Sequence, residues 1–227
     1  MNTRGLLDQL LKSGQQMLQD KTGGAKGKGG GLGDLGGLLS GAGGGALAAG
    51  AIGLLMGSKK ARNVGGKVLT YGGLAALGVV AYKAYGNWQA NRPGQPAGEP
   101  QTIDRVSGAE AERHSEAILR ALVAAAKADG HVDDRERELI EGEFVKLDGD
   151  SEFQQWLHLE LNKPLDPAEV ARAAATPEIA AEMYLASVMM VDEQHFMEKA
   201  YLDELSRQLK LDPALRQELE TQARAVA

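Results

Sequence analysis

Two similar stretches of the chain carry side chains that could bind a divalent metal ion. Residues 126–140 (AKADGHVDDRERELI) and residues 190–202 (MVDEQHFMEKAYL) each place an Asp where an apolar segment ends, a His close behind it, and a Glu in the next helix. Two such helix pairs, packed about a pseudo-two-fold axis, would bring two Asp and two Glu near one another. These residues are Asp129, His131 and Glu136 in the first stretch and Asp192, His195 and Glu198 in the second.

Side chains of these types suit particular ions. Carboxylate oxygens are preferred by Ca²⁺, Mg²⁺ and Mn²⁺, and a contribution from His131 or His195 would shift the preference toward Mn²⁺ or Zn²⁺. An Asp at a helix C-terminus opposes the helix dipole by about 0.3–1 kcal/mol, which a bound cation would relieve. The same residue types also serve as helix caps and turn formers, as Asp192 and Asp129-Gly130 could do. Two interpretations of these acidic residues are therefore open: they bind a metal ion, or they only cap helices and form turns. In the second interpretation His131 and His195 are solvated loop residues.

No catalytic motif accompanies these acidic residues. The chain has no Cys, which excludes thiol nucleophiles and Cys-ligated metals. It also contains neither HExxH nor GxSxG. Gly31-x-Gly33-x-x-Gly36 matches the dinucleotide-binding fingerprint, but no predicted strand precedes it, and Gly-rich sequence produces such matches readily. We therefore expect a protein that is not an enzyme, with a metal-dependent enzyme of unknown substrate as an alternative.

Residues 107–227 are expected to form an all-α domain, a compact bundle of about seven helices. Helix-start signals recur along this part, and some place Pro directly after a capping residue, as in Asp166-Pro167 and Thr176-Pro177. No segment shows the alternating pattern of a strand. The predicted helices begin at Ser107, Asp133, Asp150, Asp166, Thr176, Asp192 and Asp212. The helix after Asp192 is expected to point these apolar residues inward: Phe196, Met197, Tyr201, Leu205 and Leu209.

Composition divides the chain near residue 100. Residues 1–100 hold 26 of the 30 Gly residues and carry a net charge of +7, whereas residues 101–227 carry −13. Gly-rich sequence buries little side-chain area and is costly to order, so the first part is not expected to be an ordinary globular domain. Its first segment, 1–30, combines an amphipathic helix over 4–19 with a Gly/Lys linker. That helix would lie on a membrane surface or dock on a partner, unless it is a frayed helix without a role.

Residues 31–90 are expected to be a Gly-rich hydrophobic region of one or two helices that associates with a membrane. The run Leu35–Ser58 has 24 residues and no charge, which is long enough to span a bilayer. The run Val68–Trp88, interrupted by one Lys, carries aromatic residues at both ends and is the stronger spanning candidate. Basic residues lie before the first run and between the two, which leaves the topology open.

Small residues recur every four positions along the first run. This spacing is typical of membrane helices that pack closely, and it predicts self-association. A flexible linker is the alternative, since each Gly costs about 1 kcal/mol relative to Ala in a helix. The Gly residues expected to form the helix-packing surface are Gly33, Gly37, Gly41, Gly45, Gly53 and Gly57.

The chain resembles a known family over almost its whole length. The phrases AAAKADGHVDDRERELI and DEQHFMEKAYLDELSRQLKL, together with the Gly-rich hydrophobic N-terminal part, resemble the YebE-type bacterial inner-membrane proteins of unknown function. The C-terminal region of those proteins is similar to the tellurite-resistance protein TerB. The resemblance implies an all-helical TerB-like fold, an inner-membrane location and a role in envelope or metal stress. It also implies that four acidic residues hold a divalent metal: Asp129, Glu136, Asp192 and Glu198.

These observations together predict a membrane-anchored binding or scaffold protein. A Pro/Gly linker over 91–106 would join the membrane-associated region 31–90 to the TerB-like domain over 107–227. The acidic domain would bind Ca²⁺, Mg²⁺, Mn²⁺ or Zn²⁺, or a protein partner, and its side of the membrane is open. A membrane-active protein that uses the glycine repeat is a further alternative. The net charge of −6 and the lack of a basic patch interleaved with aromatics exclude general nucleic-acid binding.

Overall fold

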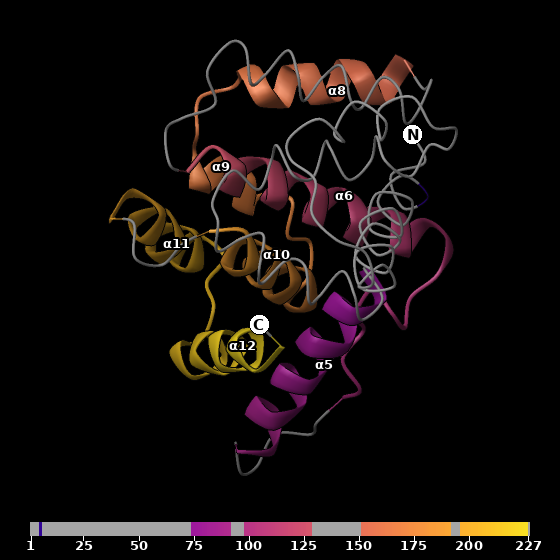
Figure 1. Cartoon of the computed structure of the whole chain (residues 1–227). Coiled ribbons are helices and arrows are strands. Elements are labelled where there is room, and N and C mark those ends of the chain that lie inside the picture. The colour runs from indigo at the N-terminus through magenta and orange to yellow at the C-terminus, as the bar shows by residue number, and fades with distance from the viewer. Residues whose placement is uncertain (1–4, 6–73, 92–97, 129–150, 192–195, 227) are drawn as a thin grey trace, which may run out of the picture.

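The computed structural model describes Gly5 and residues 74–91, 98–128, 151–191 and 196–226. These residues form helices and contain no strand, which confirms the predicted all-α class (Figure 1). The helices are α5 (Leu74–Ala90), α6 (Gly108–Ala126), α8 (Ser151–Asn162), α9 (Pro167–Ala171), α10 (Pro177–Met190), α11 (Phe196–Gln208) and α12 (Pro213–Val226).

Helix α10 is the centre of the bundle. Its sequence PEIAAEMYLASVMM is apolar on almost every side, a composition typical of helices surrounded by protein. Met183, Tyr184 and Leu185 are each 0% exposed, and α10 packs against α5, α6, α11 and α12. These four helices therefore surround α10, whereas α8 packs against α6, and α9 against α11 and α6.

Helix α5 packs against α12 and α10 (Figure 1). Ala81 and Ala84 are fully buried in this contact, and the indole nitrogen of Trp88 donates a hydrogen bond to Asp212 Oδ1 at 3.1 Å. The part of the Val68–Trp88 run that lies in α5, from Leu74 onward, therefore belongs to a helix of the bundle. Within the part of the chain that the structure describes, no helix is both long and apolar enough to cross a membrane. The prediction that this run spans the bilayer is accordingly not supported, because its small residues pack against protein helices.

Part of the predicted linker is buried in the core. Ile103 and Val106 are 2% and 7% exposed, and the Arg105 guanidinium stacks over the Tyr82 ring at 3.8 Å from its centroid. The segment approaches α5 at Gly78, where a Cβ atom would lie 2.8 Å from the backbone nitrogen of Asp104. Residues 98–106 therefore join α5 to the bundle by close packing.

Predicted helix starts are confirmed where the structure describes them. Asp166 Oδ1 accepts a hydrogen bond from Ala168 N at 2.9 Å, and Thr176 Oγ1 accepts one from Ile179 N at 3.2 Å. Asp212 does the same for α12. Ser107 occupies the N-cap of α6 without a side-chain cap bond. The predicted starts at Asp133, Asp150 and Asp192 lie outside the described residues.

The predicted inward face of α11 is wrong in its first turn. Phe196 and Met197 are 84% and 55% exposed, whereas Tyr201, Leu205 and Leu209 are buried as predicted. The buried face starts instead at Glu198, which is 7% exposed and precedes Tyr201 by three positions. At 100° per residue, Phe196 and Met197 are turned away from that face.

Candidate functional site

The predicted metal ligands lie mostly outside the described residues. This is the case for Asp129, Glu136 and Asp192, and for the additional candidates His131 and His195. Glu198 is described, and it lies buried in the first turn of α11. The described ranges contain no group of three or more His, Asp or Glu side chains that could hold a metal. The four-carboxylate site therefore stays a prediction.

The predicted glycine packing surface lies outside the described residues as well. It runs from Gly33 to Gly57, ahead of the first described helix. Its role in membrane packing and self-association stays a prediction.

A surface groove of about 750 Å³ is formed where three parts of the bundle meet. We call it the junction groove. One wall is the C-terminal half of α5, the second is the α9–α10 connection, and the third is the α11–α12 connection (helices labelled in Figure 1). Its lining residues are Tyr85, Trp88, Ala168, Ala171, Arg172, Ala174, Ala175, Thr176, Pro177, Ala180, Gln208, Leu209, Lys210, Leu211, Asp212 and Leu215.

The apolar part of the junction groove is firmly held. Tyr85 and Leu215 are 7% and 3% exposed, and the Tyr85 and Trp88 rings meet edge to face with centroids 5.0 Å apart. Five alanines complete this surface, and their small side chains leave room above it. The hydrogen bond between Trp88 and Asp212 fixes the position of the indole ring, so the apolar surface is preformed.

Two cationic side chains line the same groove. Arg172 and Lys210 are exposed, and neither side chain makes a hydrogen bond or ion pair with any described residue. Lys210 ends α11 in a left-handed conformation, with φ of 54°. Among the described residues of the lining, the one carboxylate belongs to Asp212, which accepts bonds from Trp88 and from Ala214 N. The groove therefore has a net positive lining.

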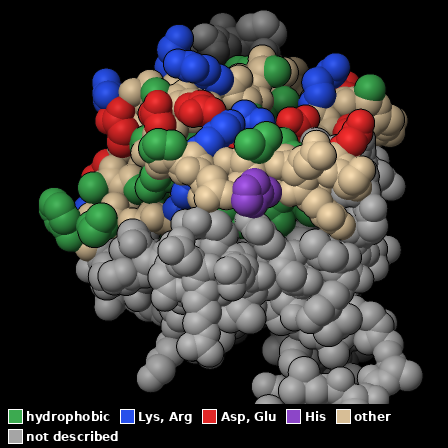
Figure 2. Space-filling view, turned by 90° about the horizontal axis from the view of Figure 1, so that it is seen from above, with side chains coloured by type: hydrophobic (Ala, Val, Ile, Leu, Met, Phe, Trp, Pro, Cys, Tyr) green, Lys and Arg blue, Asp and Glu red, His purple; other side chains and the backbone are tan. Residues whose placement is uncertain are grey.

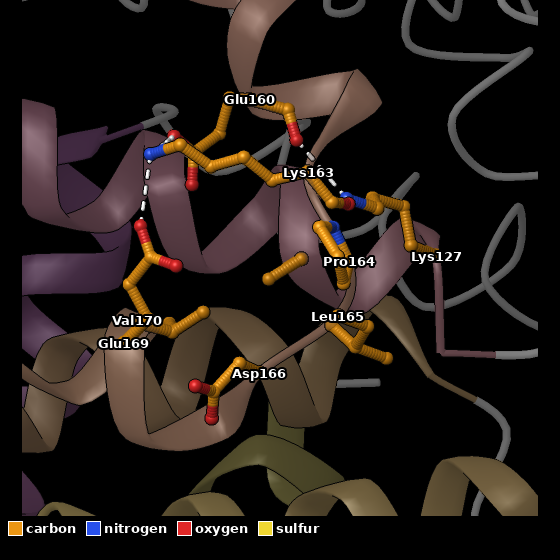
Figure 3. Close-up of a pocket in the computed structure, with 9 residues that line it drawn as sticks. Lys127, Glu160, Lys163, Pro164, Leu165, Asp166, Glu169 and Val170 are labelled. Carbon is orange, nitrogen blue, oxygen red and sulfur yellow. Dashed lines mark hydrogen bonds and ion pairs between the residues drawn. The ribbon is translucent and has the colours of Figure 1, made fainter.

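A much smaller pocket lies between α6, α8 and α9 (Figure 3). It measures about 10 Å³, roughly the room of one water molecule. Lys127 Nζ donates hydrogen bonds to the carbonyl oxygens of Glu160 and Lys163, at 3.0 and 2.5 Å, and so satisfies backbone acceptors at the end of α8. This pocket is a helix junction and is too small for an organic ligand.

An ion cluster closes that junction. Lys163 Nζ donates to Glu169 Oε1 at 2.9 Å and to Glu160 Oε2 at 3.0 Å. These two bonds raise the pKa of Lys163, and the bond from Lys163 lowers the pKa of the Glu169 carboxyl. The cluster links α8 to α9, and the Lys163 ammonium group is paired within it.

A buried acid–base pair joins α6 to α10. His114 Nδ1 lies 2.5 Å from Glu182 Oε2, and the two side chains are 1% and 0% exposed. Ile103 N donates to the other carboxylate oxygen at 2.5 Å. Burial raises the pKa of Glu182, and the hydrogen bond with His114 opposes that shift. Glu182 on α10 thus bonds both His114 on α6 and the backbone of the 98–106 segment. The buried pair therefore holds these three elements together.

Charge on the face of the molecule seen from above is mixed. Figure 2 shows acidic and basic side chains interleaved on the described part of this face, without a continuous patch of one sign. The net charge of −13 over 101–227 is therefore not gathered here into one acidic surface.

Sequence reasoning missed both the junction groove and the buried pair. Trp88 was expected at a membrane interface, but its partner is Asp212, which is 124 positions away in the sequence. Nothing in the local pattern links Arg172 to Lys210. The sequence does contain an indication of the buried pair, since Glu182 is the one charged residue in the apolar stretch 179–191. Such a lone acid predicts a partner from another helix.

Comparison with known proteins identifies relatives. A family model described as "Protein of unknown function (DUF533)" matches residues 41–223. A protein of Yersinia enterocolitica described as "Uncharacterized protein in ampR 5'region" is 32% identical over 126 residues, covering 56% of this chain and 89% of that protein. No solved structure matches the chain. Neither description states an activity or a ligand.

Proposed function

The chain belongs to the DUF533 family of proteins of unknown function, and from that premise we propose that it is a non-enzymatic binding protein. Its helical body would dock a protein partner in the junction groove. The observation that carries this proposal is the groove itself, a preformed surface of apolar side chains with two unpaired cations, Arg172 and Lys210. Its volume of about 750 Å³ falls in the range of ligand sites.

The lining of the junction groove favours binding over catalysis. Among the described residues that line it there is no His, Ser or Glu, and its one Asp is committed to Trp88 and to the start of α12. General acid–base catalysis needs a titratable group within hydrogen-bond reach of the substrate. Aromatic residues and Arg, represented in this lining by Trp88 and Arg172, are instead enriched in protein-binding sites.

We propose that the part of the chain ahead of α5 anchors the protein to the bacterial inner membrane. Support comes from the uncharged run Leu35–Ser58 and its glycine repeat, and from the resemblance to YebE-type proteins. Because α5 belongs to the bundle, the anchor would end before residue 74. The helical body is proposed to have a TerB-like fold on the same resemblance.

A photo-cross-linking experiment tests partner binding and anchoring together. A photoreactive amino acid at Lys210 of the full-length protein in cells is expected to give an adduct of discrete mass, recovered in the membrane fraction. The matched control places the same amino acid at Lys199, an exposed residue on α11 outside the groove lining. Equal adducts at both positions, or none at Lys210, would contradict the groove as the binding site. An adduct recovered wholly in the soluble fraction without detergent would contradict the anchor.

A divalent metal site is a second proposed function of the helical body. The favouring observation is Glu198, a carboxylate only 7% exposed in the first turn of α11. Glu198 follows the stretch that contains Asp192 and His195, and the resemblance to TerB supports metal binding by these acids.

Titration calorimetry on the full-length protein tests the metal proposal. The full chain is needed because a fragment starting at 101 would lack α5 and uncover α10 and α12. We expect one of Ca²⁺, Mg²⁺, Mn²⁺ or Zn²⁺ to bind below millimolar concentration, and Glu198→Gln to weaken binding by at least about tenfold. Glu152→Gln, an exposed acid at the start of α8, is the control. Absence of binding by all four ions would overturn the proposal.

A further inference from the structure

We propose that the junction groove recognises an acidic peptide segment with an apolar side chain next to its carboxylates, presented by a protein partner. This inference rests on the proposed binding function and specifies the chemistry of the ligand. It is carried by two features that meet in one place: two cations without a partner among the described residues, and an apolar surface.

Two cations of the groove lining have no partner among the described residues. Residues 101–227 contain 27 acidic and 14 basic side chains, and two arginines near the groove are paired. Arg207 on α11 pairs with Glu204, and Arg216 on α12 bonds Glu220 and Asp203. Arg172 and Lys210, which line the groove, make no such bond with the described residues, so both are available to an acidic ligand.

Helix ends of both signs meet at the groove. The N-terminus of α10 enters the lining through Thr176 and Pro177, and that of α12 through Asp212 and Leu215. The C-terminal ends of α5 and α11 enter it as well, through Trp88 and Gln208, and their dipoles have the opposite sign. The positive charge of the described lining therefore comes from Arg172 and Lys210, set against the Asp212 carboxylate, which already accepts bonds from Trp88 and Ala214 N.

Apolar surface distinguishes this groove from a site for a bare anion. A phosphate or carboxylate alone would use Arg172 and Lys210 and leave the accessible parts of Trp88 and Ala175 in water. A peptide that places a Leu or Phe beside its acidic residues would cover both parts at once. Trp and Arg are the residue types that contribute most often to the binding energy of interfaces.

Charge decides against the N-terminal part of this chain as the occupant. Residues 1–100 carry a net charge of +7 and would be repelled by the two cations. An acidic segment of a separate protein is complementary, and electrostatic attraction would speed its association.

Peptide titration on the full-length protein tests the inference. The probe is a fluorescent twelve-residue peptide of Glu and Asp with one central Leu, monitored by anisotropy. We expect micromolar binding that weakens with salt, and about a tenfold loss in Arg172→Glu/Lys210→Glu. Ala175→Asp, at an exposed groove position, should also weaken binding. Lys199→Glu is the matched charge reversal outside the groove and should bind like wild type, with thermal unfolding confirming that every variant folds.

Several outcomes would overturn the inference. One is absence of peptide binding by the wild type at millimolar concentration, and another is an equal loss in Lys199→Glu and in the groove variants. Replacement of the central Leu by Ser without effect, together with displacement by inorganic phosphate at equal concentration, would show a simple anion site. A cross-linked adduct at Lys210 without binding of the acidic peptide would overturn the acidic-peptide ligand while leaving the proposed binding function standing.

Discussion

Replacing Gly78 by Ala is expected to lower the free energy of unfolding by about 1–3 kcal/mol. A Cβ atom at this position would lie 2.6 Å from Asp104 Oδ1, 2.8 Å from Asp104 N and 2.8 Å from Ile103 Cγ2. One of these neighbours is backbone, so a side-chain rotation cannot relieve the clash. Either α5 or the 98–106 segment has to move. Urea unfolding of the full-length protein measures the change.

Gly86 is the matched control on the same helix. A Cβ atom there would meet nothing within 4 Å, so Gly86→Ala adds only the helix preference of Ala. We expect the free energy of unfolding to rise by about 0.5–1 kcal/mol. A change in stability in the same direction for both substitutions would contradict the close approach of α5 to Asp104.

Removing the Glu182 carboxylate is expected to have the largest effect of any single change proposed. Glu182→Ala leaves His114 and the Ile103 N–H without their acceptor inside the core, and breaking a buried pair of this kind costs about 3–5 kcal/mol. Glu182→Gln keeps an acceptor for Ile103 N, so it should cost less. Chemical denaturation compares the two variants with wild type. Equal stability of all three proteins would show that the pair does not hold α6 to α10.

The pH dependence of stability gives a second test of the same pair. Burial raises the pKa of Glu182 above its ordinary 4.5, so the folded protein holds this proton more tightly than the unfolded chain does. The stabilising contribution is therefore complete below about pH 4.5 and is lost as the pH rises through the folded pKa. We expect wild type to lose stability relative to Glu182→Gln over that rise. A difference that stayed constant with pH would contradict the shift.

Short-range sequence signals predicted the helix starts well where a single capping side chain decides where the helix begins. Asp166, Thr176 and Asp212 each cap the helix that the sequence places after them, because capping depends on a side chain and a backbone N–H two or three residues on. The face of α11 was predicted less well. Apolar residue type alone placed Phe196 and Met197 inward, although the helical period sets the buried face from Glu198 onward.

Long-range contacts explain what the sequence could not predict. A run of apolar and small residues looks the same whether lipid or protein surrounds it, so α5 could not be told from a spanning helix by composition. The junction groove joins the C-terminal half of α5 to two connections that lie far from it in the chain. Tertiary packing brings these parts together, and the bond from Trp88 to Asp212 is one of its contacts. The metal ligands predicted from the Asp/His/Glu stretches lie outside the described residues, Glu198 excepted.

The packing of α5 against α12 has a mechanical consequence. Helix α5 is the first described helix and α12 the last, and they are joined by hydrogen bonds from Trp88 to Asp212 and from Asn87 to Glu218. A force applied to the chain ahead of residue 74 is therefore carried through α5 to the last helix of the bundle. Because α5 also packs directly against α10, pulling on that end loads one wall of the junction groove together with the core around α10. Tension at the N-terminal side and occupancy of the groove would thus be coupled through a single helix.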